Sequence, residues 1–469
     1  MDSSVPRHER RSKYSKKSDD TRTEFRRDRD RLIYSQAFRR LAGITQVVAP
    51  QEGQTLHNRL IHSIKVGQVS RGIAEHLAES GFKEAKPFLD PDVAEFAGMA
   101  HDLGHPPFGH AAEKELQELM SSLNTDSFEG NAQTFRILSR LCGSYDGRSY
   151  GLDLTRASLQ ATLKYPYFRI VDHREAGRKW SVYRGDRDAF EWCCGEAFVS
   201  QIDATAVLPP SNLEAQVMDW ADDITYAVHD IEDFARIDVV PLDEMITEGE
   251  AWACFSDWMR SKWNMLGWQN ADQALEGALA CLQAHLPIEQ YRRRVERDRL
   301  LSGFVANMVH DCIVQTKLKE SGAARGFWGL KLKAGREAGS WELIRPPQLK
   351  LSVKALKEMV WYFVIDGPGL KSSQVGQRRA VRTIYEYFLE EATRITQGFS
   401  HVNLPPATQR SALVLKKKGV PIDAPRIACD ALCELSELQA SRLYSRLMGV
   451  HLGQSDLFSE PQEVGWFHR

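Results

Sequence analysis

Residues 92–113 read DVAEFAGMAHDLGHPPFGHAAE, and the rest of the chain is best understood from this stretch outward. It places His101, Asp102, His105, His110 and Glu113 close together in sequence. Two prolines and a glycine follow His105, so a helix end and a turn must bring these imidazoles and carboxylates near one another. Such a concentration of titratable side chains indicates a functional site.

An adjacent His-Asp pair such as His101-Asp102 offers one neutral imidazole nitrogen and one carboxylate oxygen. This mixed donor set suits manganese, iron, cobalt, nickel or zinc, and magnesium if more of the ligands are oxygens. Two ligands do not hold a metal, so partners must come from elsewhere in the chain. His62 upstream and the acidic cluster in residues 219–233 downstream are the candidates, and they give the order H…HD…D.

Hydrophobic periodicity predicts a mainly α-helical fold around these residues. His110 and Glu113 are spaced i, i+3, which places both on one helix face. Asp222, Tyr226 and Asp230 are spaced i, i+4, i+8, which forms a second such stripe. The β-branched residues at 44–48 predict a strand or extended loop, and helices are predicted over 25–41, 55–80, 93–103, 109–123, 153–166, 212–236, 350–366 and 426–448.

An ordered series of motifs runs through the first half of the chain. It comprises RDRDRLIYSQAFRRLAGITQV at 27–47, HNRLIHS at 57–63, AHDLGHPPFGHAAE at 100–113, FEGNAQTFRIL at 128–138, LTRASLQATLKYP at 154–166 and ADDITYAVHDIED at 221–233. A lone His-Asp dipeptide would be weak evidence, but this series is specific. The chain resembles the HD-domain deoxynucleoside triphosphate (dNTP) triphosphohydrolases, the bacterial dGTPase-like group, and is similar to the animal SAM-and-HD-domain dNTPases.

The resemblance implies a divalent metal cofactor, with manganese, magnesium, cobalt, nickel and iron as candidates. By residue match its ligands are His62, His101, Asp102 and Asp222. A lone helical histidine is more often packed in a core than bound to metal, but the downstream His-Asp pair reverses that expectation for His62. The implied reaction is attack of water on the α-phosphorus of a dNTP, which releases a deoxynucleoside and intact triphosphate.

The resemblance also implies which groups move protons. His110 is the leading catalytic acid or base, Glu113 is its orienting carboxylate or an alternative base, and His105 is a further catalytic candidate. Some relatives carry a histidine in an FEHN-like segment where this chain has Gly130. If that histidine belongs to their proton relay, another group must replace it here.

The expected substrate contacts rest on the resemblance as well, because an isolated lysine or tyrosine is usually an ordinary surface or core residue. Asp219 and Asp223 are expected to point away from the stripe that carries Asp222. The implied contacts are Gln46 and Tyr226 at the deoxyribose, Asp230 at its 3′-OH, Arg59, Lys164 and Lys179 at the triphosphate, and Tyr165 at the sugar or base.

Composition sets broad limits on the protein. Its 469 residues carry a formal charge of -2, which gives no overall bias toward nucleic acid or membranes, and its eight cysteines lack a disulfide-framework spacing. Without a signal peptide or a long apolar run, a cytoplasmic protein is expected. The predicted organisation is a basic tail over 1–22 that is disordered at least in part, an HD catalytic core over 23–242, and a helical C-terminal elaboration over 243–469.

Two other functions stay open from the sequence. One is a different HD phosphohydrolase, either a nucleotidase or a phosphodiesterase, which would need the same metal but not the sugar-facing residues. The other is a nucleotide-sensing or single-strand-binding regulator with an inactive site, which the presence of all four metal ligands disfavours. The expected partners are a dNTP substrate and further copies of the chain, with a dNTP or single-stranded DNA as effector and no membrane.

Overall fold

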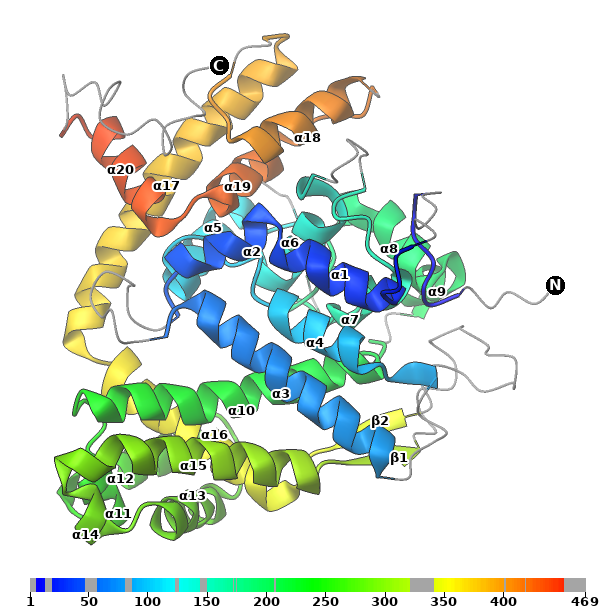
Figure 1. Cartoon of the computed structure of the whole chain (residues 1–469). Helices are drawn as coiled ribbons and strands as arrows, with labels where there is room; N and C mark the ends of the chain where they lie inside the picture. The colour runs from blue at the N-terminus through cyan, green and yellow to red at the C-terminus, as the bar shows by residue number, and fades with distance from the viewer. Residues whose placement is uncertain are drawn as a thin grey trace.

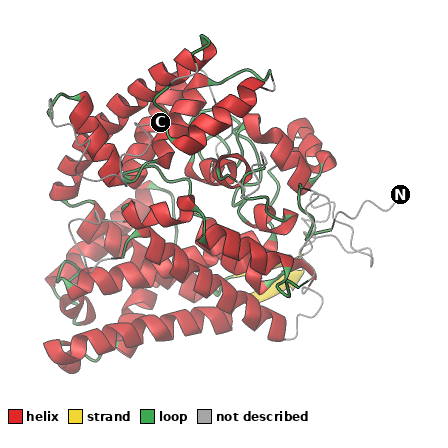
Figure 2. Ribbon diagram, turned by 45° about the horizontal axis from the view of Figure 1, so that its top comes forward, coloured by secondary structure: helices red, strands yellow, loops and turns green. Residues whose placement is uncertain are grey.

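The computed structural model describes residues 6–12, 19–46, 57–80, 87–122, 126–143, 150–171, 173, 175–205, 208–320, 341–399, 402–417 and 419–450. Over these ranges the chain is built almost entirely of helices (Figures 1 and 2). One small antiparallel sheet joins β1 (Lys317–Glu320) to β2 (Trp341–Ile344). The mainly α-helical fold expected from the sequence is therefore confirmed.

The helices of the first half surround the predicted site, and those of the second half pack against them. In chain order they are α1 (Glu24–Ile33), α2 (Gln36–Arg40), α3 (Arg59–Glu79), α4 (Pro91–Ala100), α5 (Gly109–Ser122), α6 (Gly130–Arg136), α7 (Arg156–Ala161), α8 (Arg187–Cys194), α9 (Glu196–Thr205), α10 (Leu213–Arg236), α11 (Leu242–Ile246), α12 (Glu250–Met265), α13 (Ala271–His285), α14 (Ile288–Tyr291), α15 (Arg294–Gln315), α16 (Pro347–Val360), α17 (Pro368–Thr396), α18 (Pro406–Lys417), α19 (Ala424–Glu434) and α20 (Glu437–Leu447). Short 3-10 turns lie at Leu41–Gly43 and Arg184–Asp186, and π-helical turns at Ile137–Leu141 and Trp361–Ile365.

Helices α3, α4 and α10 form the frame of the site. Asn58 caps α3 by accepting from the amide of Ile61, and Asn212 caps α10 in the same way from Ala215. Where α3 crosses α4, a Cβ placed on Gly98 would lie 2.8 Å from the Cα of Gly67. Only a pair of glycines permits so close an approach, so the sequence fixes the distance between these two helices.

Three main clusters of buried apolar side chains hold the molecule together. The first lies between α3, α10 and the helices α12 to α16, at the bottom of Figure 1. The second fills the space among α1, α4, α7, α8 and α9. The third joins α5 to α17, α19 and α20 at the top of Figure 1. Helix α5 therefore rests on a different core from α3 and α10.

Several predicted elements differ from those observed. The helix expected over 426–448 is two helices, because Ser436 and Gln439 form a capping box that starts α20. The helix expected over 153–166 is limited to α7. Residues 44–46 form no strand, in keeping with the loop that was the other expectation for 44–48, and 47–48 lie outside the described residues.

The N-terminal segment also differs from expectation where it is described. Residues 6–12 lie against the first-half helices, and Arg10 donates to Glu24 at 2.7 Å and forms an ion pair with the buried Asp28. Ser12 donates through its amide to Asp153 at 3.0 Å. Buried carboxylates far away in sequence thus hold a segment whose composition alone indicated disorder. Residues 1–5 and 13–18 of the expected tail lie outside the described residues.

Candidate metal centre and substrate site

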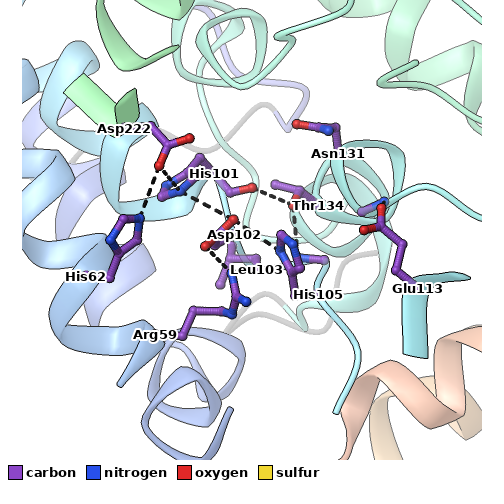
Figure 3. A network of polar contacts seen from close by, with 12 residues as sticks. Arg59, His62, His101, Asp102, Leu103, His105, Glu113, Asn131, Thr134 and Asp222 are labelled. Carbon is purple, nitrogen blue, oxygen red and sulfur yellow. Dashed lines mark hydrogen bonds and ion pairs between the residues drawn. The ribbon is translucent and has the colours of Figure 1, made fainter. Parts of the chain in front are cut away.

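Four side chains from three parts of the chain meet at one point (Figure 3). His62 lies on α3, Asp222 lies on α10, and His101 and Asp102 directly follow α4. The Nε2 atoms of His62 and His101 lie 3.1 and 3.5 Å from Oδ1 of Asp222. Nε2 of His101 also lies 3.3 Å from Oδ1 of Asp102. The structure thus brings together the four residues expected to bind metal.

The backbone orients His101 for this role. Its Nδ1 lies 2.7 Å from the carbonyl oxygen of Gly98 and donates to it, so Nε2 faces the carboxylates. The turn that follows is packed tightly, since a Cβ on Gly104 would lie 2.0 Å from the carbonyl oxygen of Gly130. The two prospective ligands that follow α4 therefore stand on rigid backbone.

The electrostatics of the group fit a divalent cation. Burial alone would raise the pKa values of Asp102 and Asp222, but Arg59 beside the first and His101 beside the second lower both. Burial would lower the pKa of His101, yet the two carboxylates raise it to about 9. Burial prevails at His62 and lowers its pKa. The two carboxylates stabilise a positive charge placed between them. Together with the two imidazoles they form a donor set suited to manganese, iron, cobalt or nickel.

Arg59 is held beside this group. Its side chain is buried and forms an ion pair with Asp102, while its Nε donates to the carbonyl oxygen of Thr45 at 3.1 Å. A guanidinium has five N–H donors in a planar fork, so it can bind a phosphate while keeping such contacts. Arg59 thus lies beside the four prospective metal ligands, and its contact with a triphosphate stays a prediction.

A second group of polar side chains surrounds His105, whose Nδ1 lies 3.1 Å from Oδ1 of Asp102. The imidazoles of His105 and His110 are 5.3 Å apart between centroids, and Nδ1 of His110 lies 3.1 Å from Oε2 of Glu113. The side chain of His110 is 75% exposed, whereas Glu113 is buried. Burial would raise the pKa of Glu113, but His110 and Lys179 lower it, so Glu113 is an ionised partner for His110.

Gly130 lies directly against this second group. Its amide donates to Oε1 of Glu113 at 3.1 Å, and a Cβ built on it would lie 3.4 Å from that oxygen and 3.8 Å from Cε1 of His105. The side chain of a histidine at position 130 would therefore project toward Glu113 and His105. Glu129, the preceding residue, is buried, and its Oε1 lies 2.8 Å from Nζ of Lys179. Sequence reasoning missed Glu129, although it lies within a quoted motif.

The expected lysine contacts both lie near the site and are held by carboxylates. Nζ of Lys164 lies 2.5 Å from Oδ1 of Asp219 and 3.9 Å from Oδ2 of Asp222. Nζ of Lys179 lies 3.5 Å from Oε1 of Glu113. Tyr165 is half-buried next to Lys164. The two ammonium groups thus each lie beside carboxylates, Lys164 beside Asp219 and Lys179 beside Glu113 and Glu129.

Two of the three residues expected at the sugar, Gln46 and Asp230, carry a buried oxygen without a hydrogen-bond partner among the described residues. These atoms are Oε1 of Gln46 and Oδ2 of Asp230. Tyr226 lies on α10 between Asp222 and Asp230 and packs against the first core. Both oxygens are therefore free to accept a hydrogen bond.

Two further cations that sequence reasoning missed lie beside α10. Arg345 forms ion pairs with Asp219 and Asp223, and Nζ of Lys357 lies 2.6 Å from Oδ1 of Asp223 and 5.1 Å from the ring centre of Tyr226. Asp219 and Asp223 therefore face cations outside the metal group. No motif marked Arg345 or Lys357, because their proximity depends on how β2 and α16 pack on α10.

Comparison with known proteins places this arrangement in a class. The model of the HD domain family matches residues 59–227, a range that includes all four prospective metal ligands. The chain is 35% identical over 377 residues to a deoxyguanosinetriphosphate triphosphohydrolase-like protein of Corynebacterium efficiens, covering 78% of this chain and 80% of that one. A protein of the same name from Corynebacterium glutamicum (strain R) is 34% identical, with 82% and 84% covered. A Shewanella sp. (strain ANA-3) relative of that name is 28% identical, with 97% and 98% covered.

The fold and the site thus define an HD-superfamily phosphohydrolase. Within that class the chain belongs to the deoxyguanosinetriphosphate triphosphohydrolase-like family. None of the helices in the described ranges is long and apolar enough to cross a membrane.

Proposed function

We propose that this protein is a metal-dependent dNTP triphosphohydrolase, which converts a dNTP into a deoxynucleoside and triphosphate. The observation that carries the proposal is the convergence of His62, His101, Asp102 and Asp222 beside buried oxygens that have no partner. The printed names of the relatives support the substrate class. When bound by these four residues, a divalent cation supplies a Lewis acid for the α-phosphate and acidifies water.

The surrounding cations bind the triphosphate. Arg59 is held against Asp102, and the ammonium groups of Lys164 and Lys179 each lie beside carboxylates. Phosphate oxygens compete with the present carboxylate partners of these cations, because charge-assisted hydrogen bonds to phosphate are strong. We expect a triphosphate bound in this way to bring its α-phosphorus close to His105 and His110.

Proton transfer falls to His110. Its imidazole is largely exposed to solvent and is paired with the ionised Glu113, which fixes the ring. Water attacks the α-phosphorus, the P–O5′ bond breaks, and His110 is the proton donor or acceptor in this step. His105, held against Asp102, is the alternative acid or base.

Recognition of the deoxyribose falls to α10 and to Gln46. Asp230 accepts a hydrogen bond from the 3′-OH, Tyr226 packs on the sugar ring, and Gln46 faces the 2′ position, while Tyr165 contacts the sugar or base. The unpaired oxygens of Asp230 and Gln46 support these roles, since a 3′-OH would satisfy the first.

Product analysis tests the proposal. Each dNTP is incubated with the protein and manganese, magnesium, cobalt, nickel or iron, and the products are separated by chromatography. We expect deoxynucleoside and triphosphate in equal amounts. The His62→Ala variant should lose turnover. The matched control His76→Ala should keep normal turnover, because His76 lies on the same helix near its end. Release of monophosphate or pyrophosphate would indicate another HD phosphohydrolase, and binding without turnover would indicate a regulator.

We further propose, from the family resemblance, a cytoplasmic homo-oligomer whose activity responds to a dNTP or single-stranded DNA. The domain division at residues 22 and 242 is part of this proposal. Light scattering of the purified protein after size-exclusion chromatography tests the assembly, and a monomer at assay concentration would refute it.

A further inference from the structure

A cavity of about 580 Å³ lies away from the four prospective metal ligands, where α18 and α19 cover α1 and α2 (Figure 1). This volume is within the roughly 300–1,000 Å³ of small-molecule sites. Ile137, Leu141 and Tyr34 give it apolar walls. Arginines from α1, α2 and α18 line it as well, so the cavity combines apolar surface with positive charge.

The carboxylates that line the cavity are already engaged. Asp30 accepts from Arg22 at 2.7 Å, Asp153 from the amide of Ser12 at 3.0 Å, Asp430 from Arg136 at 2.8 Å, and Glu434 from the amide of Thr408 at 3.0 Å.

Two of the arginines have no such partner. Arg40 donates to the carbonyl oxygens of Leu103, His105 and Leu435 at 2.8, 2.8 and 3.0 Å, and it forms no ion pair with a carboxylate of the described residues. Burial lowers its pKa to about 10, while the nearby Glu434 and Glu437 carboxylates act in the opposite direction. Arg410 lines the same cavity and has neither an ion pair nor a hydrogen bond to a described residue. Both guanidinium groups thus lack an ion pair within the described residues, and Glu434 is a lining carboxylate whose charge acts on both of them.

We propose that this cavity binds a phosphate monoester with an aromatic or apolar body. Arg40 and Arg410 supply two guanidinium groups for the phosphate, whose oxygens match their planar donor geometry. Ile137, Leu141 and Tyr34 contact the body of the ligand. A bare inorganic anion would leave these apolar walls unfilled.

Arg40 also connects the cavity to the metal group. Its carbonyl partners, Leu103 and His105, flank Gly104 in the turn that begins with Asp102. A ligand phosphate can accept from the remaining N–H groups of Arg40 while those two bonds persist. We expect the ligand to make the turn more rigid, and an effect on catalysis follows only if the proposed function holds.

Calorimetric titration with 2-naphthyl phosphate tests the binding site without requiring turnover. We expect Arg410→Gln to weaken binding by about tenfold or more, since a hydrogen bond to a charged group is worth about 1.5 kcal/mol or more. Ala407→Trp, which fills the cavity without changing charge, should weaken binding similarly. Arg299→Gln on α15, at the opposite end of Figure 1, is the matched control and should bind normally.

Further titrations show whether the phosphate, the aromatic body or both contribute to the affinity. Inorganic phosphate and 2-naphthol should each bind more weakly than the ester, and His62→Ala should bind the ester like wild type. Equal binding by Arg410→Gln, equal binding of phosphate alone, or loss of binding in His62→Ala would each overturn the assignment. Amide hydrogen exchange over residues 101–108 should slow when the ester is bound, and unchanged exchange would refute the connection through Arg40.

Discussion

Replacing Asp230 with asparagine should make the protein more stable and less active. The side chain of Asp230 is 3% exposed, and its Oδ2 has no hydrogen-bond partner in the described part of the chain. Leaving a buried polar group unpaired costs about 1–3 kcal/mol, and more when the group is charged. Asparagine keeps the shape but removes the charge, so we expect a gain of about 1–2 kcal/mol in the free energy of unfolding.

The gain should depend on pH in a defined direction. Burial, together with the charges of Asp233 and Asp222, raises the pKa of Asp230 well above its ordinary value. The folded state therefore binds this proton more tightly than the unfolded state, and stability falls as pH rises from the ordinary pKa toward the raised one. The advantage of Asp230→Asn should be largest above the raised pKa and should shrink as pH falls toward about 4.

Urea unfolding at several pH values measures this difference through the shift of the midpoint. Asp233→Asn is the matched control, because Asp233 is equally buried on the same helix but accepts from the amide of His57 at 2.7 Å, so its loss should destabilise. In the same samples dNTP hydrolysis by Asp230→Asn should fall by about tenfold, because the amide oxygen of asparagine accepts a weaker bond from the 3′-OH than a carboxylate does. If Asp230→Asn proves less stable than wild type at pH 8, the oxygen is satisfied in solution and the reasoning fails.

Other predictions follow from the same geometry. His101→Ala should abolish hydrolysis and lower the bound metal measured by elemental analysis, and wild-type activity in this variant would defeat the metal assignment. Tyr226→Ala should narrow the kcat/KM ratio between deoxyribose and ribose triphosphates, whereas an equal loss for both would argue against a sugar contact. Removal of metal by EDTA should stop turnover, and added manganese should restore it. Asp430→Ala leaves the buried guanidinium of Arg136 without one of its carboxylates and should lower the free energy of unfolding by about 3–5 kcal/mol, measured by urea titration.

Local signals accounted for much of the fold. Helix α10 was expected over 212–236 and runs over Leu213–Arg236, because Asn212 provides a cap and the apolar residues recur at helical spacing. The same periodicity misled at the C-terminus, where leucines on both α19 and α20 fit one continuous helix. The Ser436-x-x-Gln439 pattern was the available signal for the break, and it was outweighed by periodicity.

Long-range pairing is what the sequence did not show. The His-Asp motif led to four residues that the structure brings together, since their order along the chain was informative. Arg345 and Lys357 lie beside α10 only because of the way later helices pack on it. Arg10 likewise forms ion pairs with Asp28 and Glu24, and composition alone does not predict such pairs.

The candidate site draws its residues from helices that pack in different apolar cores. His62 and Asp222 stand on helices anchored in one apolar core, whereas His110 and Glu113 stand on α5, anchored in another with α17 and α19. Loosening that second core, for example at Phe388, should leave metal affinity intact while shifting His110, the imidazole that we propose as proton donor or acceptor. A displacement of about 1 Å can slow a reaction roughly 100-fold, so variation far from the chemistry can tune the rate of this enzyme without touching its cofactor.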